Sequence, residues 1–244
     1  AYFTNKKLPK RKGVHSHPTL LPTFRNAMTG RHILSEPIVI TGIGMIASVG
    51  DDRESVWEAV RNGRSNFRYL HGIPGIEDDT IVGATVDLPQ RLDGRLKVLP
   101  LCEIASAEAL EDSGVDLGNL DLNQFGCSIG GHMGDTSWMR EQLGMALPEN
   151  RPNWWEQWFP NTACSMIARK YGLCGPRLCN STACSTSLIS IMTAVRSIRD
   201  RQCDIMLAGG ADPPDPMILA GFDPRRAPAQ AHDPNRARKR VRAG

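Results

Sequence analysis

The chain has 244 residues, of which 41% are apolar and 23% are charged, an ordinary composition for a globular protein with a core to bury. Its net charge is +3, but residues 1–35 carry +7, residues 224–244 carry +6 and residues 36–223 carry −10. No apolar run approaches the roughly 18 residues of a membrane span, and seven cysteines without C-x-x-C pairs argue against a disulfide framework or a zinc site. We expect a protein of the reducing cytoplasm, without a metal, a cofactor or a membrane contact.

The two basic ends are predicted to be tails. Residues 1–36 form a proline-containing basic arm that we expect to be disordered, and residues 224–244 form a basic tail without apolar periodicity. Nucleic-acid binding is the alternative, but neither end interleaves aromatic residues with its charges, and no known nucleic-acid-binding motif accompanies them. We therefore expect no nucleic-acid partner, and place one folded unit at residues 37–223.

Strands and helices alternate along this unit. The pattern predicts strands at 38–46, 81–86, 125–129, 177–182 and 204–211, and helices at 52–63, 101–112, 162–171 and 184–199. The first strand is a continuous apolar run, typical of a strand that is buried on both faces. This alternation predicts an α/β fold with a mostly parallel central sheet and helices on both faces.

Two of these helices have apolar residues at helical spacing. Val56, Trp57 and Val60 lie on one face of the first helix. On the last helix the apolar residues are Leu188, Ile191, Met192, Val195 and Ile198. We expect the last helix to be buried by this face.

Cys184 is the candidate catalytic residue. It lies in the string Asn180-Ser181-Thr182-Ala183-Cys184-Ser185-Thr186-Ser187, between a predicted strand and the last helix. The first turn of a helix offers unpaired N–H groups and the positive end of the dipole, which favour a thiolate and can hold an oxyanion. The alternative is that Cys184 is one more small buried residue. Its strand-to-helix position and the small residues around it favour a nucleophile.

A second Thr-Ala-Cys-Ser string contains Cys164. It follows Trp158-Phe159-Pro160 rather than a strand, so nothing presents its thiol at the edge of a sheet. We therefore predict that Cys164 belongs to the core of its helix.

Several motifs together resemble the β-ketoacyl-acyl-carrier-protein synthases, condensing enzymes with the thiolase fold. The resemblance runs in order through residues 38–222. Its motifs are Val39-Ile40-Thr41-Gly42-Ile43-Gly44, Trp57, Gly63-Arg64-Ser65, Gly175-Pro176, Thr182-Ala183-Cys184-Ser185 and Asp204-Ile205-Met206-Leu207-Ala208-Gly209-Gly210. Each motif is weak alone, but in this order and spacing they are specific.

The resemblance implies that Cys184 accepts an acyl group from a carrier-protein or coenzyme A thioester, with its own backbone N–H as one oxyanion donor. A malonyl unit then loses carbon dioxide and attacks the acyl-cysteine, which gives a β-ketoacyl thioester for fatty-acid or polyketide synthesis. The implied partners are an acyl carrier protein with phosphopantetheine-linked acyl and malonyl groups, and either a second copy or a complementing second half.

The chain departs from the family in two respects. The family has a second half that supplies catalytic histidines, a lysine and a glycine-rich loop, and none of the six histidines here matches those positions. The sequence from Pro224 onward is Arg-rich where the family stays apolar, which suggests a truncation or a shifted reading frame near residue 224. We expect the isolated half to expose an apolar face and to depend on a partner chain.

Three alternatives to this function are open. Gly42-Ile43-Gly44 approximates a dinucleotide-binding fingerprint, but no helix follows at once and no acidic strand end appears about 20 residues later. A cysteine hydrolase would need a histidine partner near Cys184, and no histidine lies between His132 and the tail. A non-catalytic fragment that binds a carrier protein or a synthase partner would carry the same motifs.

Overall fold

A computed structural model describes residues 37–72, 81–86, 88, 95–131, 157 and 159–213, together with the backbone of residues 2–5. The rest of the basic arm, the basic tail and the tryptophans at 154, 155 and 158 lie outside the described residues. The expectations for these segments therefore stay predictions.

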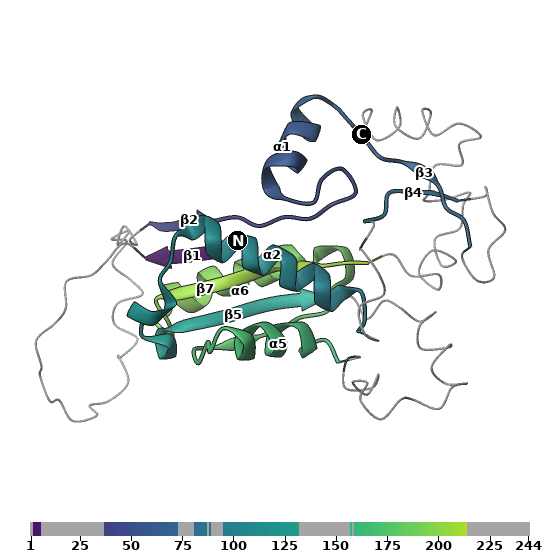
Figure 1. The fold of residues 1–244 in the computed structure, drawn as a ribbon. Coiled ribbons are helices and arrows are strands. Elements are labelled where there is room, and N and C mark those ends of the chain that lie inside the picture. The colour runs from purple at the N-terminus through teal and green to yellow at the C-terminus, as the bar shows by residue number, and fades with distance from the viewer. Residues whose placement is uncertain are drawn as a thin grey trace, which may run out of the picture.

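The described chain is built on a five-stranded sheet in the order β2-β1-β7-β5-β6 (Figure 1). Its strands are β1 (Tyr2–Asn5), β2 (Ile38–Gly42), β5 (Phe125–Gly131), β6 (Arg177–Leu178) and β7 (Ile205–Ala211). A separate pair of short strands consists of β3 (Arg68–Tyr69) and β4 (Val82–Gly83). Because β5 runs parallel to β6 and β7, and only β1 is antiparallel to its neighbours, the predicted mostly parallel sheet is confirmed.

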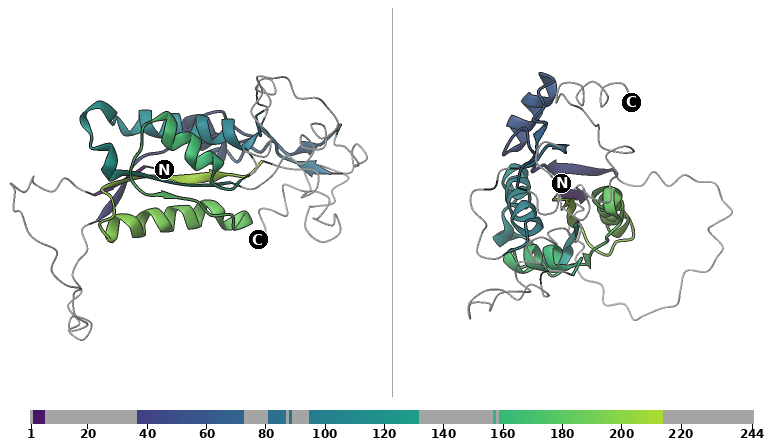
Figure 2. Two further views of the ribbon diagram at one scale, coloured as in Figure 1. Left: turned by 90° about the horizontal axis from the view of Figure 1, so that it is seen from below. Right: turned by 90° about the vertical axis from the view of Figure 1, so that its right-hand side faces the viewer.

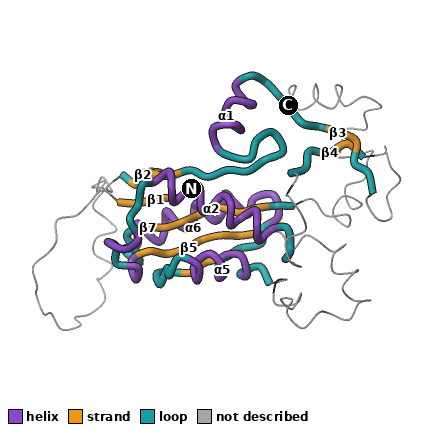
Figure 3. The backbone as a smooth tube through the Cα atoms, viewed as in Figure 1, coloured by secondary structure: helices purple, strands orange, loops and turns teal. Residues whose placement is uncertain are grey.

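Helices cover both faces of the sheet, as expected (Figure 2). Helices α2 (Val98–Ser113) and α5 (Thr162–Lys170) lie on one face, and α6 (Thr186–Arg199) lies on the other. The other helical elements of the described residues are α1 (Arg53–Arg61) and the 3-10 turns η2 (Leu117–Asn119), η3 (Leu122–Gln124) and η4 (Ala183–Ser185) (Figure 3). In this described part of the chain no helix has the length and apolarity to cross a membrane.

Each face of the sheet has its own apolar core. Side chains of β5 and β7, among them Phe125 and Leu207, pack with α2 and α5 in the larger core. On the opposite face, Met206 and Ala208 pack against Ala194 and Ile198 of α6. Successive residues of β7 thus point to opposite sides, as in any strand that is covered on both faces.

The N-terminal arm needs a correction for its first residues. Tyr2–Asn5 are not outside the fold but form β1, which pairs with β2 on one side and with β7 on the other. The sequence of β1 is too short to give an alternating pattern, and its pairing partners are distant along the chain. The local sequence pattern therefore cannot predict β1.

The expectation that the first strand is buried on both faces is wrong. Strand β2 ends at Gly42 rather than at residue 46, and it forms the edge of the sheet. Val39 and Ile40 are 41% and 54% exposed. An apolar run predicts a strand, but it does not say whether a neighbour covers both faces.

The expected helix faces are also partly wrong. In α1 the buried residues are Val56 and Ala59, while Trp57 and Val60 are exposed. In α6 the buried residues are Thr186, Ser190, Ala194, Ser197 and Ile198. Leu188 and Met192 are 60% and 53% exposed, so α6 turns mainly small residues, together with Ile198, toward the sheet.

Gly42 and Gly44 serve the contact between the first strand and α2. A Cβ atom on Gly42 would lie 2.1 Å from the carbonyl oxygen of Ala109, and one on Gly44 would lie 1.9 Å from that of Ala105. Only glycine allows this approach of two backbones. Packing against α2 thus accounts for the glycines that approximate a dinucleotide fingerprint.

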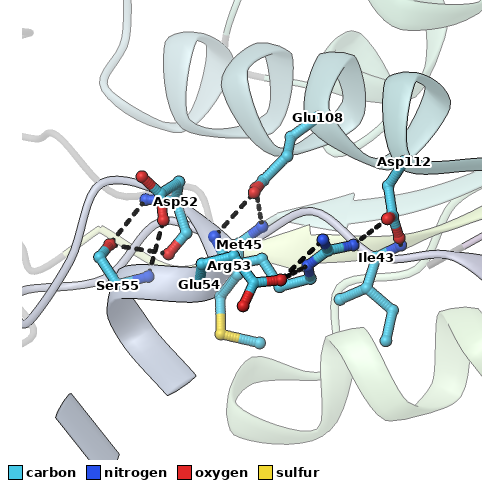
Figure 4. Close-up of polar contacts among 8 residues, drawn as sticks. All are labelled: Ile43, Met45, Asp52, Arg53, Glu54, Ser55, Glu108 and Asp112. Carbon is cyan, nitrogen blue, oxygen red and sulfur yellow. Dashed lines mark hydrogen bonds and ion pairs between the residues drawn. The ribbon is translucent and has the colours of Figure 1, made fainter. Parts of the chain in front are cut away.

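Two carboxylates of α2 fix the chain that follows β2 (Figure 4). Glu108 accepts hydrogen bonds from the backbone N–H groups of Met45 and Arg53, both at 2.7 Å. Asp112 accepts one from the N–H of Ile43 at 2.8 Å and forms an ion pair with the Arg53 guanidinium. The hydrogen bonds to Arg53 and to the Ile43 N–H lower the pKa of Asp112. These contacts fix the first residue of α1, Arg53, against α2.

This contact should make the stability of the fold depend on pH. The pKa of Asp112 is lower in the folded chain than in the unfolded chain. The ionised carboxylate therefore stabilises the fold above the unfolded pKa of about 4, and this stabilisation is lost as the pH falls through the folded pKa. We expect Asp112→Asn to lower the melting temperature at pH 7 and to lower it less as the pH falls below about 4. Melting curves between pH 3 and pH 7 test this, with Glu111→Gln as a control carboxylate on the same helix. A difference between Asp112→Asn and the unchanged chain that keeps its full size from pH 7 to pH 3 would contradict it.

Candidate active site

Cys184 lies at the corner between the sheet and α6. Strand β6 ends at Leu178, residues 179–182 form a loop, and η4 carries Cys184 immediately before α6 begins at Thr186. The strand and the helix are both shorter here than expected, so Cys184 precedes the helix rather than forming its first turn. Its side chain is exposed, as access by a substrate would require.

The backbone at this corner is strained. Ala183, directly before Cys184, has a φ of 49°, and Arg201 is the other non-glycine residue of the described chain with positive φ. This conformation costs an L-residue about 1 to 2 kcal/mol. Such strain persists only where the surrounding structure holds it in place, and it is concentrated at functional sites.

Hydrogen bonds tie the loop to α6 and hold the corner. The Thr182 N–H donates to Thr186 Oγ1 at 2.9 Å, and the Ser185 hydroxyl donates to the Thr182 carbonyl oxygen at 2.9 Å. Asn180 donates through Nδ2 to Ser190 Oγ at 2.8 Å and accepts from the Thr182 hydroxyl at 2.9 Å. The polar residues around Cys184 therefore brace one another, and none of these four hydrogen bonds uses the thiol.

Two strand glycines allow α6 to lie close to the sheet. A Cβ atom on Gly130 would be 2.3 Å from Thr186 Cγ2 and 2.6 Å from the Asn180 carbonyl oxygen. One on Gly210 would be 2.8 Å from Ser187 Oγ. Both glycines stand near the carboxyl ends of parallel strands, the edge at which α/β sheets place their sites. The corner that carries Cys184 therefore lies at the carboxyl ends of β5 and β7.

Cys164 is helix core, as predicted. It is 2% exposed, and its thiol donates to the Cys127 carbonyl oxygen at 3.4 Å across the contact between α5 and β5. Cys127 is fully buried, and its hydrogen bond with Cys164 together with burial raises its pKa. Burial raises the pKa of Cys102 to about 12 and that of Cys203 to about 11. All four thiols are buried, and the raised pKa values keep those of Cys102, Cys127 and Cys203 protonated at neutral pH.

This division of the cysteines predicts an alkylation pattern. Brief treatment of the native chain with iodoacetamide at pH 7 should modify at most the three exposed thiols, those of Cys174, Cys179 and Cys184. After denaturation all seven should react. Intact mass spectrometry counts the added groups, and a fourth rapid addition to the native chain would contradict the buried positions.

The described part of the chain contains one of the six histidines. His71 follows β3 at an exposed position, and the other five histidines lie outside the described residues. Sequence analysis also missed the bracing roles of Asn180 and Ser190, because no local pattern links two polar residues ten positions apart. The glycines that end β5 and β7 were the available signal for close helix packing.

The fold defines the class of the protein. A type II polyketide ketosynthase bound to its acyl carrier protein matches with a TM-score of 0.67 at 23% identity, over 80% of this chain and 50% of that one. The ketosynthase of Xenorhabdus doucetiae in complex with its chain length factor matches with a TM-score of 0.63 at 19% identity, over 79% of this chain and 51% of that one. At these identities the likeness establishes the fold, which is the thiolase-type α/β fold of ketosynthases.

The sequence identifies the family. The profile "Beta-ketoacyl synthase, N-terminal domain" matches residues 95–244, more than half of the chain. The chain belongs to the β-ketoacyl synthase family, and the resemblance drawn from its motifs is confirmed.

Individual relatives agree with this assignment. A 3-oxoacyl-[acyl-carrier-protein] synthase 2 of Vibrio cholerae is 32% identical over 80% of this chain and 50% of its own length. A putative actinorhodin polyketide β-ketoacyl synthase of Streptomyces coelicolor is 29% identical over 82% of this chain and 47% of its own length. The chain thus spans about half the length of the curated relatives it matches.

Proposed function

We propose that the chain is the N-terminal half of a β-ketoacyl-acyl-carrier-protein synthase, and that Cys184 is its acyl-accepting nucleophile. The observation that carries this proposal is the exposed thiol at a strained, braced corner between the sheet and α6, in a chain of this family. In this assignment residues 37–223 form the synthase half, to whose sheet the basic arm adds β1, and a basic tail follows.

The first half-reaction needs only this corner and a thioester. The Cys184 thiolate attacks the acyl carbonyl carbon, a new C–S bond forms, and the carrier's C–S bond breaks as the carrier leaves as a thiolate, which then takes a proton from water. The Ser185 N–H donates to the Thr182 carbonyl oxygen and the Thr186 N–H to that of Ala183. Because these two amides are used within the turn, we assign the oxyanion of the tetrahedral intermediate to the Cys184 N–H.

The second half-reaction forms the carbon–carbon bond. A malonyl thioester loses carbon dioxide, its α-carbon attacks the acyl-cysteine, and the Cys184 thiolate is released with formation of a β-ketoacyl thioester. This step needs proton control and a second oxyanion donor. We assign these roles to the half of the relatives that this sequence does not span.

The substrates and partners follow from the same proposal. We assign the acyl and malonyl groups to phosphopantetheine arms of an acyl carrier protein, and a second copy or a complementing half to the completed enzyme. Support comes from the matched ketosynthases that were solved with a carrier protein or a chain length factor. The seven free cysteines agree with a cytoplasmic location.

Sequential addition of substrates tests the function. The chain is incubated with an acyl carrier protein that bears an acyl group, its mass is measured, and malonyl carrier protein is then added. We expect an acyl adduct on the chain. Release of a β-ketoacyl product would show that the chain catalyses both half-reactions. An acyl adduct without this product would show that it catalyses only the first.

The second candidate is a non-catalytic subunit that binds a carrier protein or a synthase partner. This second function is favoured because the chain covers only about half of the length of the relatives it matches. Carrier-protein binding without any acyl adduct would establish this function in place of the first.

A further inference from the structure

The side chain of Asn180 links the loop before Cys184 to the interior of α6. Its Nδ2 donates to Ser190 Oγ at 2.8 Å, and its Oδ1 accepts from the Thr182 hydroxyl at 2.9 Å. Ser190 is fully buried in the second turn of α6. One amide group thus connects a residue two positions before Cys184 to a buried point of the helix.

The main chain of Asn180 is held by a different element. Its carbonyl oxygen lies against Gly130 of β5, where a Cβ atom would be only 2.6 Å away. Every residue of β5 is buried, so this contact is made with the centre of the fold. Strand β5 and helix α6 therefore fix the Asn180 backbone and its amide group separately.

Thr182 transmits this support to the residues around the thiol. Its N–H donates to Thr186 Oγ1 at 2.9 Å, and its carbonyl oxygen accepts from the N–H and the hydroxyl of Ser185. Ala183, with its positive φ of 49°, lies directly between Thr182 and Cys184. An L-residue keeps this conformation only where its neighbours hold it, so the direction of the Cys184 N–H depends on Thr182.

We propose that Asn180 is a positioning residue for acyl transfer, which acts through Thr182 to keep the backbone N–H of Cys184 aimed at the acyl oxygen. This inference rests on the proposed function, in which that N–H stabilises the oxyanion of the tetrahedral intermediate. An oxyanion donor is effective when it already points to the place where the charge will develop. Supporting hydrogen bonds from a rigid helix are a means to fix such a group.

Two reactions of the same thiol separate positioning from general stability. Attack on a thioester develops an oxyanion and needs the aimed donor. Alkylation by iodoacetamide displaces iodide without forming an oxyanion, so it needs only an accessible thiolate. Loss of the Asn180 amide should therefore slow acylation of Cys184 and leave its alkylation nearly unchanged.

Asn180→Ala tests this in the full chain, with octanoyl-coenzyme A as the acyl donor. We expect the limiting rate of acylation to fall at least about tenfold, while the donor concentration that gives half of this rate changes little. Alkylation of Cys184, followed in the tryptic peptide 178–196, should change by less than about twofold. Ser181→Ala, at an exposed position of the same loop, is the matched control and should leave both rates unchanged.

Thr182 offers a second pair of variants at an exposed position. Thr182→Ser keeps the hydroxyl that donates to Asn180 and should be acylated at nearly the normal rate. Thr182→Val keeps the branched shape without the hydroxyl, and should show the slow acylation of Asn180→Ala. Adding Ser190→Ala to Asn180→Ala should slow acylation no further, because the two side chains form one link.

The outcomes separate this inference from the proposed function. If Asn180→Ala is acylated as fast as the unchanged chain, or if its acylation and alkylation slow equally, the positioning role is overturned while Cys184 stays the acyl acceptor. Acylation of Thr182→Val as fast as that of Thr182→Ser overturns this role too. An unchanged chain that takes no octanoyl group overturns the proposed function, and this inference with it.

Discussion

Replacing Cys184 by alanine is expected to reduce acylation of the chain by an acyl thioester at least about 100-fold, because the change removes the thiol that we propose as the nucleophile. The fold should be unaffected, since the side chain is exposed and no hydrogen bond within the described chain depends on its sulfur. Intact mass spectrometry over time gives the acylated fraction, and the melting temperature reports the fold.

Cys174→Ala is the matched control for this prediction. Cys174 is also exposed and lies ten residues upstream, after α5. Loss of its thiol should leave acylation unchanged. If the Cys184→Ala chain were acylated as fast as the unchanged chain, the acyl group would have another acceptor and Cys184 would not be the nucleophile.

Replacing Gly130 by alanine should disturb the corner without touching the thiol. The new methyl group would stand 2.3 Å from Thr186 Cγ2 and 2.6 Å from the Asn180 carbonyl oxygen, so α6 or the loop before it must move. Forced overpacking of this kind costs about 1 to 3 kcal/mol of stability. A shift of about 1 Å at a catalytic group can lower the rate by about 100-fold. Urea unfolding and the acylation rate measure the two effects.

Gly118→Ala is the control for the added methyl group. Gly118 lies in η2, and its Cβ would meet one side-chain oxygen, that of Asp116 at 3.3 Å. This change should alter the free energy of unfolding by less than about 1 kcal/mol and leave acylation unchanged. A Gly130→Ala chain that is acylated at the normal rate would mean that the approach of α6 to β5 does not position Cys184.

Local patterns predicted most of the fold because its central strands carry their own signals. Phe125–Gly131 and Ile205–Ala211 are continuous apolar runs, and both proved to be adjacent parallel strands. The helix after Cys184 was also placed within two residues of its observed start. Alternation of such segments is sufficient to define the α/β class.

The parts that could not be predicted depend on neighbours that are remote in sequence. The position of β1 is set by pairing with β2 and β7, and the exposure of Leu188 follows from glycines on β5 and β7 that turn the small face of α6 inward. The strain at Ala183 has the same origin, because the contacts of Asn180 and Thr182 with α6 hold it. The sequence singles out Cys184 as the candidate nucleophile, but the hydrogen bonds that brace the loop around it are visible only in the structure.

The central proposal is that one sulfur accepts the acyl group. Trypsin should release residues 178–196 as a single peptide that contains both Cys179 and Cys184. After incubation of the unchanged chain with an acyl thioester, fragmentation of this peptide in a tandem mass spectrometer locates the added mass. The account predicts the acyl group on Cys184. An acyl group on Cys179, or an acylated chain in which this peptide is unmodified, would contradict it.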